Sequence, residues 1–200
     1  MLEILMKGGP VIWPLLVVSI VCLTVVIERL WFIFNELASR KPADVEDLFG
    51  QLEKKKLEEA IRVGSRSTDF VARAMAYALK HRGNSLSNAF LQAANRELSR
   101  FSRGLPVLDT VITLAPLLGL LGTVTGLIHS FGLLGDQELQ APTALTGGIA
   151  QALIATAFGL VIAVTALIPF NYLNARLEAA RRELEDTGTQ MELLLRGEGN

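Results

Sequence analysis

The chain has 200 residues, of which 50% are hydrophobic, and its mean hydropathy of +0.39 is high for a soluble domain. Its formal net charge of −1 gives no basis for nucleic-acid binding, and its one cysteine, Cys22, excludes an intrachain disulfide. These features favour a membrane protein.

Three stretches are apolar enough to cross a bilayer, which takes roughly 20 residues of helix. We predict transmembrane helices at residues 11–34, 105–134 and 149–173, and the second is free of formal charge from Thr110 to Gly135. We interpret the first as a retained helix rather than a signal peptide, because its apolar run ends in the sequence ERLWF at Glu28 and not in a small-residue cleavage site.

Lysine and arginine in the flanking segments predict the orientation of the spans. The segment between the first and second spans, residues 35–104, holds 13 basic residues, and the tail 174–200 holds four. The connector 135–148 holds none. We therefore expect the long loop and the tail in the cytoplasm, with residues 1–10 and the connector on the outside.

The long loop carries helical patterns of its own. We predict one or two charged helices over Val45–Arg66, another over Asp69–His81, and an amphipathic helix over Leu86–Phe101, where one face recurs at 3.6-residue spacing. The apolar stripe of the third span continues to Leu184, so we expect that helix to extend beyond the membrane and to end near Gly188. The fold class is an all-α membrane protein with long cytoplasmic helical extensions.

The second and third spans each carry a face of small residues. Small residues let helix backbones approach closely inside a bilayer, where hydrophobicity does not drive helices together. We expect these two faces to turn inward around a guest helix rather than outward to acyl chains. The faces consist of Gly119, Gly122, Thr123, Gly126 and Ser130 in the second span, and of Gly148, Ala152, Thr156, Gly159, Ala163 and Ala166 in the third.

Gln151 and Thr156 are the polar members of the small-residue stripe of the third span, and Thr123 lies on the small-residue face of the second. A hydroxyl or amide in a dry bilayer needs a hydrogen-bond partner, which is either a neighbouring helix or a group in a central space that both faces line. His129, toward the outer end of the second span, serves either packing or proton handling. The membrane interior holds no unpaired carboxylate, so a proton that crosses here needs an acid from another chain.

The chain resembles the TolQ/ExbB/MotA family of proton-channel subunits, and within it ExbB and TolQ most. The residues that carry the resemblance are APLLGLLGTVTGLIHSF at Ala115–Phe131, GGIAQALIATAFGLVIAVTALIPFNYL at Gly147–Leu173, and IERL at Ile27–Leu30. The resemblance implies a multi-pass protein of the bacterial inner membrane with a periplasmic N-terminus and a cytoplasmic C-terminus. It also implies a homo-oligomer, expected to be a pentamer, in which the second and third spans line a central pore.

The family also implies partners and site residues. The pore of family members holds single-span helices of an ExbD- or TolR-like protein, whose membrane aspartate carries the proton. Thr123 and Thr156 match the family threonines that face this aspartate, whereas the pore glutamate of the family falls on Gln151, which does not titrate. Proton flow would then do work on a TonB- or TolA-like protein for outer-membrane transport, with no cofactor and no metal.

Three alternatives stay open. A TolQ-like role would serve envelope integrity and cell division instead of transport. A non-conducting membrane scaffold would use the small-residue faces for assembly alone. An intramembrane enzyme would need a nucleophile with a base, or paired acids, at depth, and neither Ser19 nor Ser130 has such neighbours in the sequence; we expect no enzyme. The transported cargo does not follow from the sequence.

Overall fold

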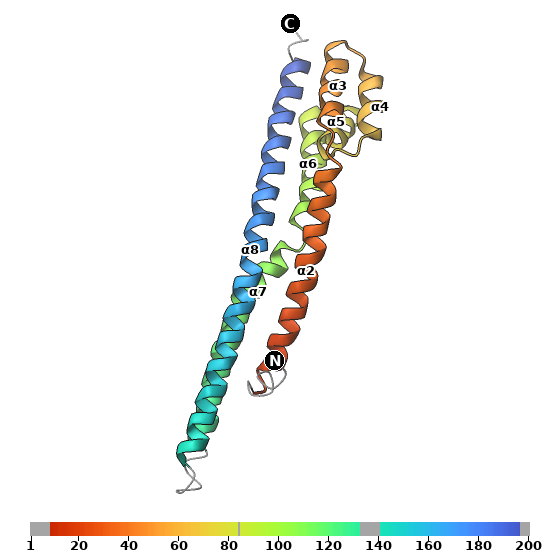
Figure 1. The fold of residues 1–200 in the computed structure, drawn as a ribbon. Coiled ribbons are helices and arrows are strands. Elements are labelled where there is room, and N and C mark those ends of the chain that lie inside the picture. Colours follow the sequence, from red (N-terminus) through yellow and green to blue (C-terminus); the bar gives the residue numbers. More distant parts are fainter. Residues whose placement is uncertain (1–8, 84, 133–140, 197–200) are drawn as a thin grey trace. The chain divides into compact units, whose positions relative to one another are not determined.

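The computed structural model describes residues 9–83, 85–132 and 141–196, so residues 135–140 of the predicted connector 135–148 lie outside the described residues, whereas residues 141–148 are helical. The described residues are almost entirely helical and contain no strand, which confirms the all-α prediction. The helices are α2 Ile12–Ala38, α3 Pro42–Glu53, α4 Leu57–Arg66, α5 Phe70–Lys80, α6 Leu86–Ser102, α7 Leu105–Gly132 and α8 Ala141–Arg196 (Figure 1).

Three helical stretches are long and apolar enough to cross a membrane, as predicted: Ile12–Ala38, the α7 part of Leu86–Gly132, and Thr146–Leu195. Between 17% and 22% of the most apolar window of each stretch is buried inside the chain. Most of the apolar surface is therefore left for lipid or for other chains.

The chain divides into two compact units. The first, here called the span unit, comprises Met1–Glu28 and Gly104–Asn171; the second unit comprises Arg29–Arg103 and Tyr172–Asn200. Both α2 and α8 contribute one part to each unit, and each unit is described by itself below.

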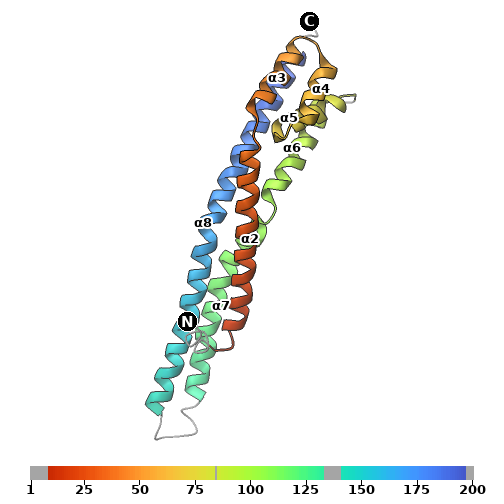
Figure 2. The same ribbon diagram turned by 45° about the vertical axis from the view of Figure 1, so that its right-hand side comes forward.

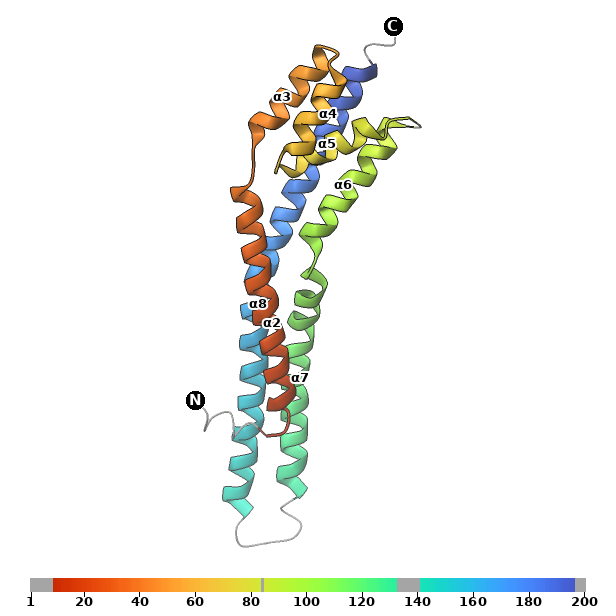
Figure 3. The ribbon, with the colours of Figure 1, turned by 90° about the vertical axis from the view of Figure 1, so that its right-hand side faces the viewer.

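In the span unit, α7 lies along the first half of α8 in all three views (Figures 1, 2 and 3). The first half of α2 joins this pair and buries Ile12, Leu15 and Cys22. A mostly apolar cleft of about 370 Å³ separates this part of α2 from the segment of α8 around Phe158 and Ile162. The unit is therefore a close pair of helices with a more loosely packed third.

In the second unit, α5 is the central helix. Eight of its residues are buried, because alanines and large apolar side chains cover nearly its whole circumference. The carboxylate of Asp69 accepts a hydrogen bond from the backbone N–H of Val71 at 2.9 Å and caps the start of the helix. The helices predicted over Val45–Arg66 and Asp69–His81 are confirmed as α3, α4 and α5, and that over Leu86–Phe101 is confirmed as α6.

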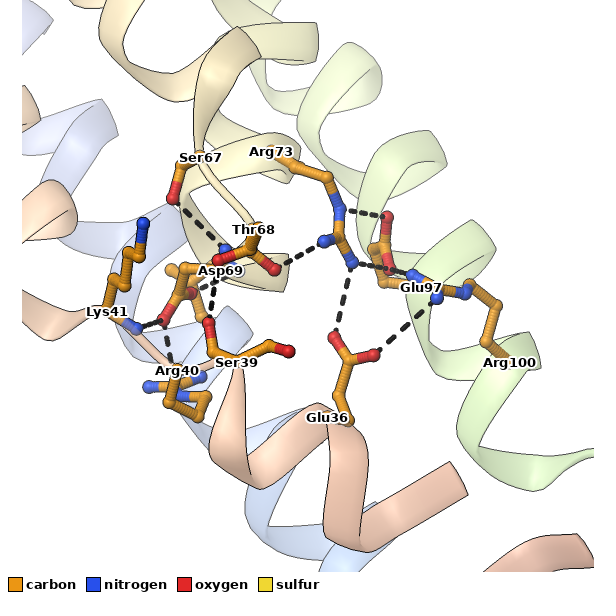
Figure 4. A network of polar contacts seen from close by, with 11 residues as sticks. Glu36, Ser39, Arg40, Lys41, Ser67, Thr68, Asp69, Arg73, Glu97 and Arg100 are labelled. Atoms are coloured by element: carbon orange, nitrogen blue, oxygen red, sulfur yellow. Dashed lines mark hydrogen bonds and ion pairs between the residues drawn. The ribbon is translucent and has the colours of Figure 1, made fainter. Parts of the chain in front are cut away.

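A network of charged side chains joins the end of α2 to α5 and α6 (Figure 4). Arg73 contacts Glu97 at 2.9 Å and Glu36 at 3.3 Å, and Arg100 contacts the same two carboxylates at 2.7 and 3.5 Å. On its own, burial would raise the pKa of Glu97, but the hydrogen bonds and charges of the two arginines hold that pKa below its ordinary value. On its own, burial would lower the pKa of Arg73, but its hydrogen bonds and charge contacts with Glu97 and Glu36 raise that pKa above its ordinary value.

A second group of contacts fixes the turn between α2 and α3. Arg40 pairs with the buried carboxylate of Asp69 at 3.3 Å and with Glu183 of α8. The backbone N–H of Lys41 donates to Asp69 at 3.0 Å (Figure 4). One buried aspartate therefore caps α5 and also holds the end of α2.

The prediction that α8 ends near Gly188 is wrong, because the helix continues to Arg196. A β-carbon at Gly188 would lie 2.7 Å from Cε1 of Phe90, and Met191 beyond it is buried. The glycine therefore marks a close contact with α6 rather than a helix end, and packing outweighs its poor helix propensity of about 1 kcal/mol.

Candidate functional site

The contact between α7 and α8 is built by residues without bulky side chains. A β-carbon at Gly119 would lie 2.9 Å from Cα of Thr156, and one at Gly126 would lie 3.0 Å from Cβ of Ala152. Real β-carbons are essentially never found closer than 3.0 Å to another atom of this kind, so only glycine fits at position 119, while at position 126 a β-carbon would require its neighbour to shift by a few tenths of an ångström. The two helices run antiparallel, and the contact extends over several turns of each.

The other predicted packing positions also lie in close contact between the two helices. A β-carbon at Gly122 would meet that of Ala155 at 2.5 Å, while Gly159 lies against the carbonyl of Ala115 and Gly148 against the hydroxyl of Ser130. Ala163 is also buried, with 8% of its surface exposed. The two small-residue faces thus contact each other within one chain. The sequence predicted that they surround a guest helix, so a surface for such a helix has to come from the residues beside this contact.

Two hydroxyl groups lie at the edge of the contact. The hydroxyl of Thr156 donates to the carbonyl of Gly119 on the other helix at 2.9 Å, and that of Thr123 donates to the carbonyl of Leu120 at 2.6 Å. Because the two acceptors are successive carbonyls of α7, the structure brings both threonines to one turn. Both residues are half-buried. Each hydroxyl uses its single proton in this way, so only its capacity to accept a hydrogen bond remains.

Gln151 lies apart from the two threonines, about 7.5 Å along α8 from Thr156 by helical rise. It lines a pocket of about 360 Å³ together with Thr125 and His129. Its amide nitrogen occupies the place that a β-carbon of Gly9 would take, and Gly9 has a φ of +72°, a backbone conformation that favours glycine. The structure therefore places the predicted polar residues at two separate positions.

The sequence reasoning missed the segment before the first span. Val11 lies 3.6 Å from the position that a β-carbon of Gly122 would take, and Gly9 and Pro10 line the pocket of Gln151. The Gly-Gly-Pro sequence at residues 8–10 signals a turn, but nothing in it predicts a contact with the second and third spans.

The described part of the chain offers no metal centre, since no three of its His, Cys, Asp and Glu side chains are grouped to hold an ion. In sequence, the uncharged run from Thr110 to Gly135 surrounds the two-hydroxyl turn. Fold and site together define a multi-pass membrane protein with a tightly packed helix pair, in which hydroxyl oxygens lie within a stretch that supplies no acid of its own.

Comparison with known proteins agrees with this class. Residues 53–186 match the MotA/TolQ/ExbB proton channel family. An ExbB-like biopolymer transport protein of Synechocystis sp. is 35% identical over 98% of this chain and 79% of its own length. A second ExbB-like protein of the same organism is 32% identical over 96% of this chain and 93% of its own.

The Tol-Pal system protein TolQ of Haemophilus influenzae is 38% identical over 46% of this chain and 40% of its own length. The chain belongs to the MotA/TolQ/ExbB proton channel family, close to its ExbB and TolQ members.

Proposed function

We propose that this chain is an inner-membrane proton-channel subunit that converts proton-motive force into mechanical work. Its partners are an ExbD- or TolR-like single-span protein with a membrane aspartate, and a TonB- or TolA-like protein that receives the force. The observation that carries the proposal is the turn that brings the hydroxyls of Thr123 and Thr156 together in a segment that has no acid of its own.

The assembly that fits this role is a homo-oligomer, a pentamer by family likeness, with α7 and α8 around a central pore. Residues 1–10 and 135–148 face the periplasm, and residues 35–104 and 174–200 face the cytoplasm. The distribution of lysine and arginine supports this orientation. The large apolar surface that a single chain leaves exposed supports assembly in the bilayer with copies of itself and with lipid.

The hydrogen bonds of the two threonines suggest which form of the partner's acid they stabilise. Their protons are engaged with carbonyls, so their oxygens can accept a bond from a protonated carboxyl group but have no proton to give to a carboxylate. The hydroxyls would thereby favour the neutral acid inside the pore. One charge that crosses 100 mV releases about 2.3 kcal/mol, which sets the scale of the work available per proton.

Gln151 has a different part in this proposal. It carries no titratable group, and it lies in the pocket that contains Thr125 and His129 rather than beside the threonine pair. We therefore assign it to hydrogen bonding near the outer end of the pathway and not to proton transfer.

Within the family, an ExbB-like role in biopolymer transport is favoured over a TolQ-like role in envelope integrity. The relatives that match over nearly the whole chain are ExbB-like, although the relatives named ExbB and those named TolQ each match over less than half of it. The identity of the single-span partner distinguishes the two roles.

The test is to reconstitute the chain in liposomes with its single-span partner and to measure proton flux under an applied potential. We expect flux that disappears when the partner's membrane aspartate is replaced by asparagine. Equal flux with and without that carboxyl group would contradict the proposal. Stable assembly without any flux would favour the non-conducting scaffold.

A further inference from the structure

The cleft between α2 and α8 in the span unit is large and carries no charge. It has a volume of about 370 Å³ and is lined by residues between positions 12 and 23 of α2 and between positions 158 and 165 of α8. None of the described residues that line it carries a formal charge. Because an apolar cavity of about 150 Å³ inside a protein already binds benzene, this cleft has room for a longer apolar group.

The cleft has a buried floor and an open mouth. Leu15, Cys22 and Ile162 line it and are each less than a tenth exposed. Leu23 and Val161 also line it, and they are 48% and 63% exposed. The cleft is therefore a recess in the outer surface of the span unit, open along one side, and not an internal void.

The mouth of the cleft continues into the lipid-facing surface of the protein. Ile20 lies one helical turn from Leu23, Ile168 lies two turns from Val161, and both isoleucines are more than half exposed. All four residues belong to stretches that are long and apolar enough to cross a membrane. In a bilayer, acyl chains therefore lie directly at the mouth of the cleft.

Side chains of the protein do not close the cleft. On α2, the inner face passes from Leu15 to the small residues Ser19 and Cys22. On α8, the hydroxyl of Thr165 donates to the carbonyl of Val161 at 2.7 Å, so its proton is used within its own helix. The apolar walls therefore lack contacts on one side, and an apolar group that fits between them gains dispersion contacts with both.

The length and width of the cleft restrict what it can hold. Positions 12 to 23 rise by about 16 Å along α2, which is close to half of a hydrocarbon core of ~30 Å. Spread over this length, the volume of the cleft gives a mean cross-section of about 23 Å², whereas a helix about 10 Å across occupies about 80 Å². The cleft is therefore too short and too narrow for a further transmembrane helix, and it has the shape of a single extended chain within one leaflet.

We infer that the cleft binds one acyl chain of a phospholipid, taken from the leaflet that surrounds the start of α2. The methylene groups of this acyl chain lie between Leu15 of α2 and Ile162 of α8 and complete the loose contact of these helices. The inference goes beyond the proposed function, because it concerns the packing of α2 and involves neither Thr123 nor Thr156.

Photolabelling tests this inference in the full-length protein, reconstituted in vesicles of phosphatidylethanolamine and phosphatidylglycerol. The probe is a phosphatidylcholine with a diazirine in the middle of one acyl chain, added as a minor component. The protein is extracted into detergent without probe before irradiation, so that loosely held lipid exchanges away. We expect one probe per protein chain, attached to the peptides that contain positions 12–23 or 158–165.

Two variants of α2 show whether the label comes from the cleft. Ser19→Leu places a larger side chain inside it and should reduce labelling at least fivefold. Thr24→Leu is the matched control, because Thr24 is exposed, bonds to Ile20 of its own helix and does not line the cleft. This variant should be labelled like the unmodified protein. If Ser19→Leu gives too little folded protein, Ile162→Phe narrows the cleft from α8 and carries the same expectation.

Two results of the labelling would overturn the inference. One is equal labelling of Ser19→Leu and Thr24→Leu. The other is a label confined to exposed positions outside the cleft, such as Ile168, which would mean that the probe lies only in the ordinary lipid layer.

Thermal unfolding gives a second readout on the same preparations. Removal of lipid by prolonged washing in detergent should lower the melting temperature of the unmodified protein, and added phosphatidylcholine should restore it. Ser19→Leu should lose less on washing, because its own side chain takes part of the space of the acyl chain. Equal losses in Ser19→Leu and Thr24→Leu would contradict the inference.

Discussion

The helix α8 packs in two different ways along its length. In the span unit it contacts α7 through Gly148, Ala152 and Gly159, so that backbone lies nearly against backbone. In the second unit it packs through large side chains such as Leu184 and Met191, and Arg40 pairs with its Glu183. One helix thus combines a contact made by small residues with a contact made by large and charged ones.

The difference follows from what surrounds each part. Between helices in lipid, burial of apolar surface brings no gain over contact with acyl chains, so close fit and hydroxyl-to-carbonyl hydrogen bonds hold the pair together. The second unit has many charged residues on its surface and a core of large side chains, as in a protein in water. The contact between α7 and α8 therefore requires glycine, because larger side chains would keep the helices apart. The contact in the second unit instead requires large side chains to fill its core.

The largest expected effect comes from adding volume at the glycine contact. Gly159→Leu should destabilise the chain by at least about 3 kcal/mol or prevent its folding, because its β-carbon would meet the carbonyl of Ala115. Gly147→Leu is the control, since no atom lies within 4 Å of a β-carbon there. Thermal unfolding in detergent measures both. Equal stability of the two variants would show that α7 and α8 do not pack in this way.

The next effect concerns the charged contact of the second unit. Glu97→Gln should cost roughly 1–3 kcal/mol, because Arg73 and Arg100 each lose one of their two carboxylate partners in a half-buried place. Glu59→Gln breaks an exposed pair with Arg62 and should cost less than about 0.5 kcal/mol. Denaturant unfolding compares the two. A difference too small to resolve would mean that the network contributes little to the stability of this unit.

The pKa of Glu97 predicts a smaller effect that depends on pH. Because this pKa is lowered in the folded chain, the carboxylate stabilises the fold above the ordinary glutamate value of about 4.3, and this stability is lost as the pH falls through the folded pKa. The melting temperature should therefore fall more steeply between about pH 4.5 and pH 3 in the unmodified chain than in Glu97→Gln. Parallel curves for the two proteins would contradict this assignment.

The smallest effect is expected where a glycine has no packing role. Gly50 lies inside α3 with nothing within 4 Å of a β-carbon, so Gly50→Ala should stabilise the chain by about 0.5–1 kcal/mol through helix propensity. Gly188→Ala, also inside a helix, should instead destabilise it because of Phe90. Unfolding midpoints of the two variants that move in the same direction would contradict the distinction between packed and unpacked glycines.

The sequence predicted those parts of the fold that depend on local pattern. The apolar spans and α6 follow from hydropathy and 3.6-residue periodicity, which residues close in the chain determine. The end of α8 was misplaced because the effect of Gly188 depends on Phe90, far away in the chain. Glu97 lies on α6, which the sequence predicts, but its partner Arg73 comes from another helix.

The same limit applies to the candidate site. The stripes of glycine and alanine predicted close helix packing, but they did not distinguish a guest helix from a neighbour in the same chain. Thr123 bonds to Leu120 of its own helix, but that Thr156 reaches the neighbouring carbonyl of Gly119 depends on the register between α7 and α8, which is set by the contacts of Gly119 and Gly159. No local pattern determines this register.

The central claim is that the glycine contact holds the hydroxyls of Thr123 and Thr156 on one turn beside the proton pathway. Its most direct test is proton flux through the chain reconstituted with its partner, with Thr123→Val and Thr156→Val combined. The control combines Thr113→Val and Thr165→Val, whose exposed hydroxyls bond only to their own helices. We expect the first pair to reduce flux at least tenfold and the control pair to leave it within twofold. Equal flux through both double variants, at equal amounts of assembled complex, would contradict the account.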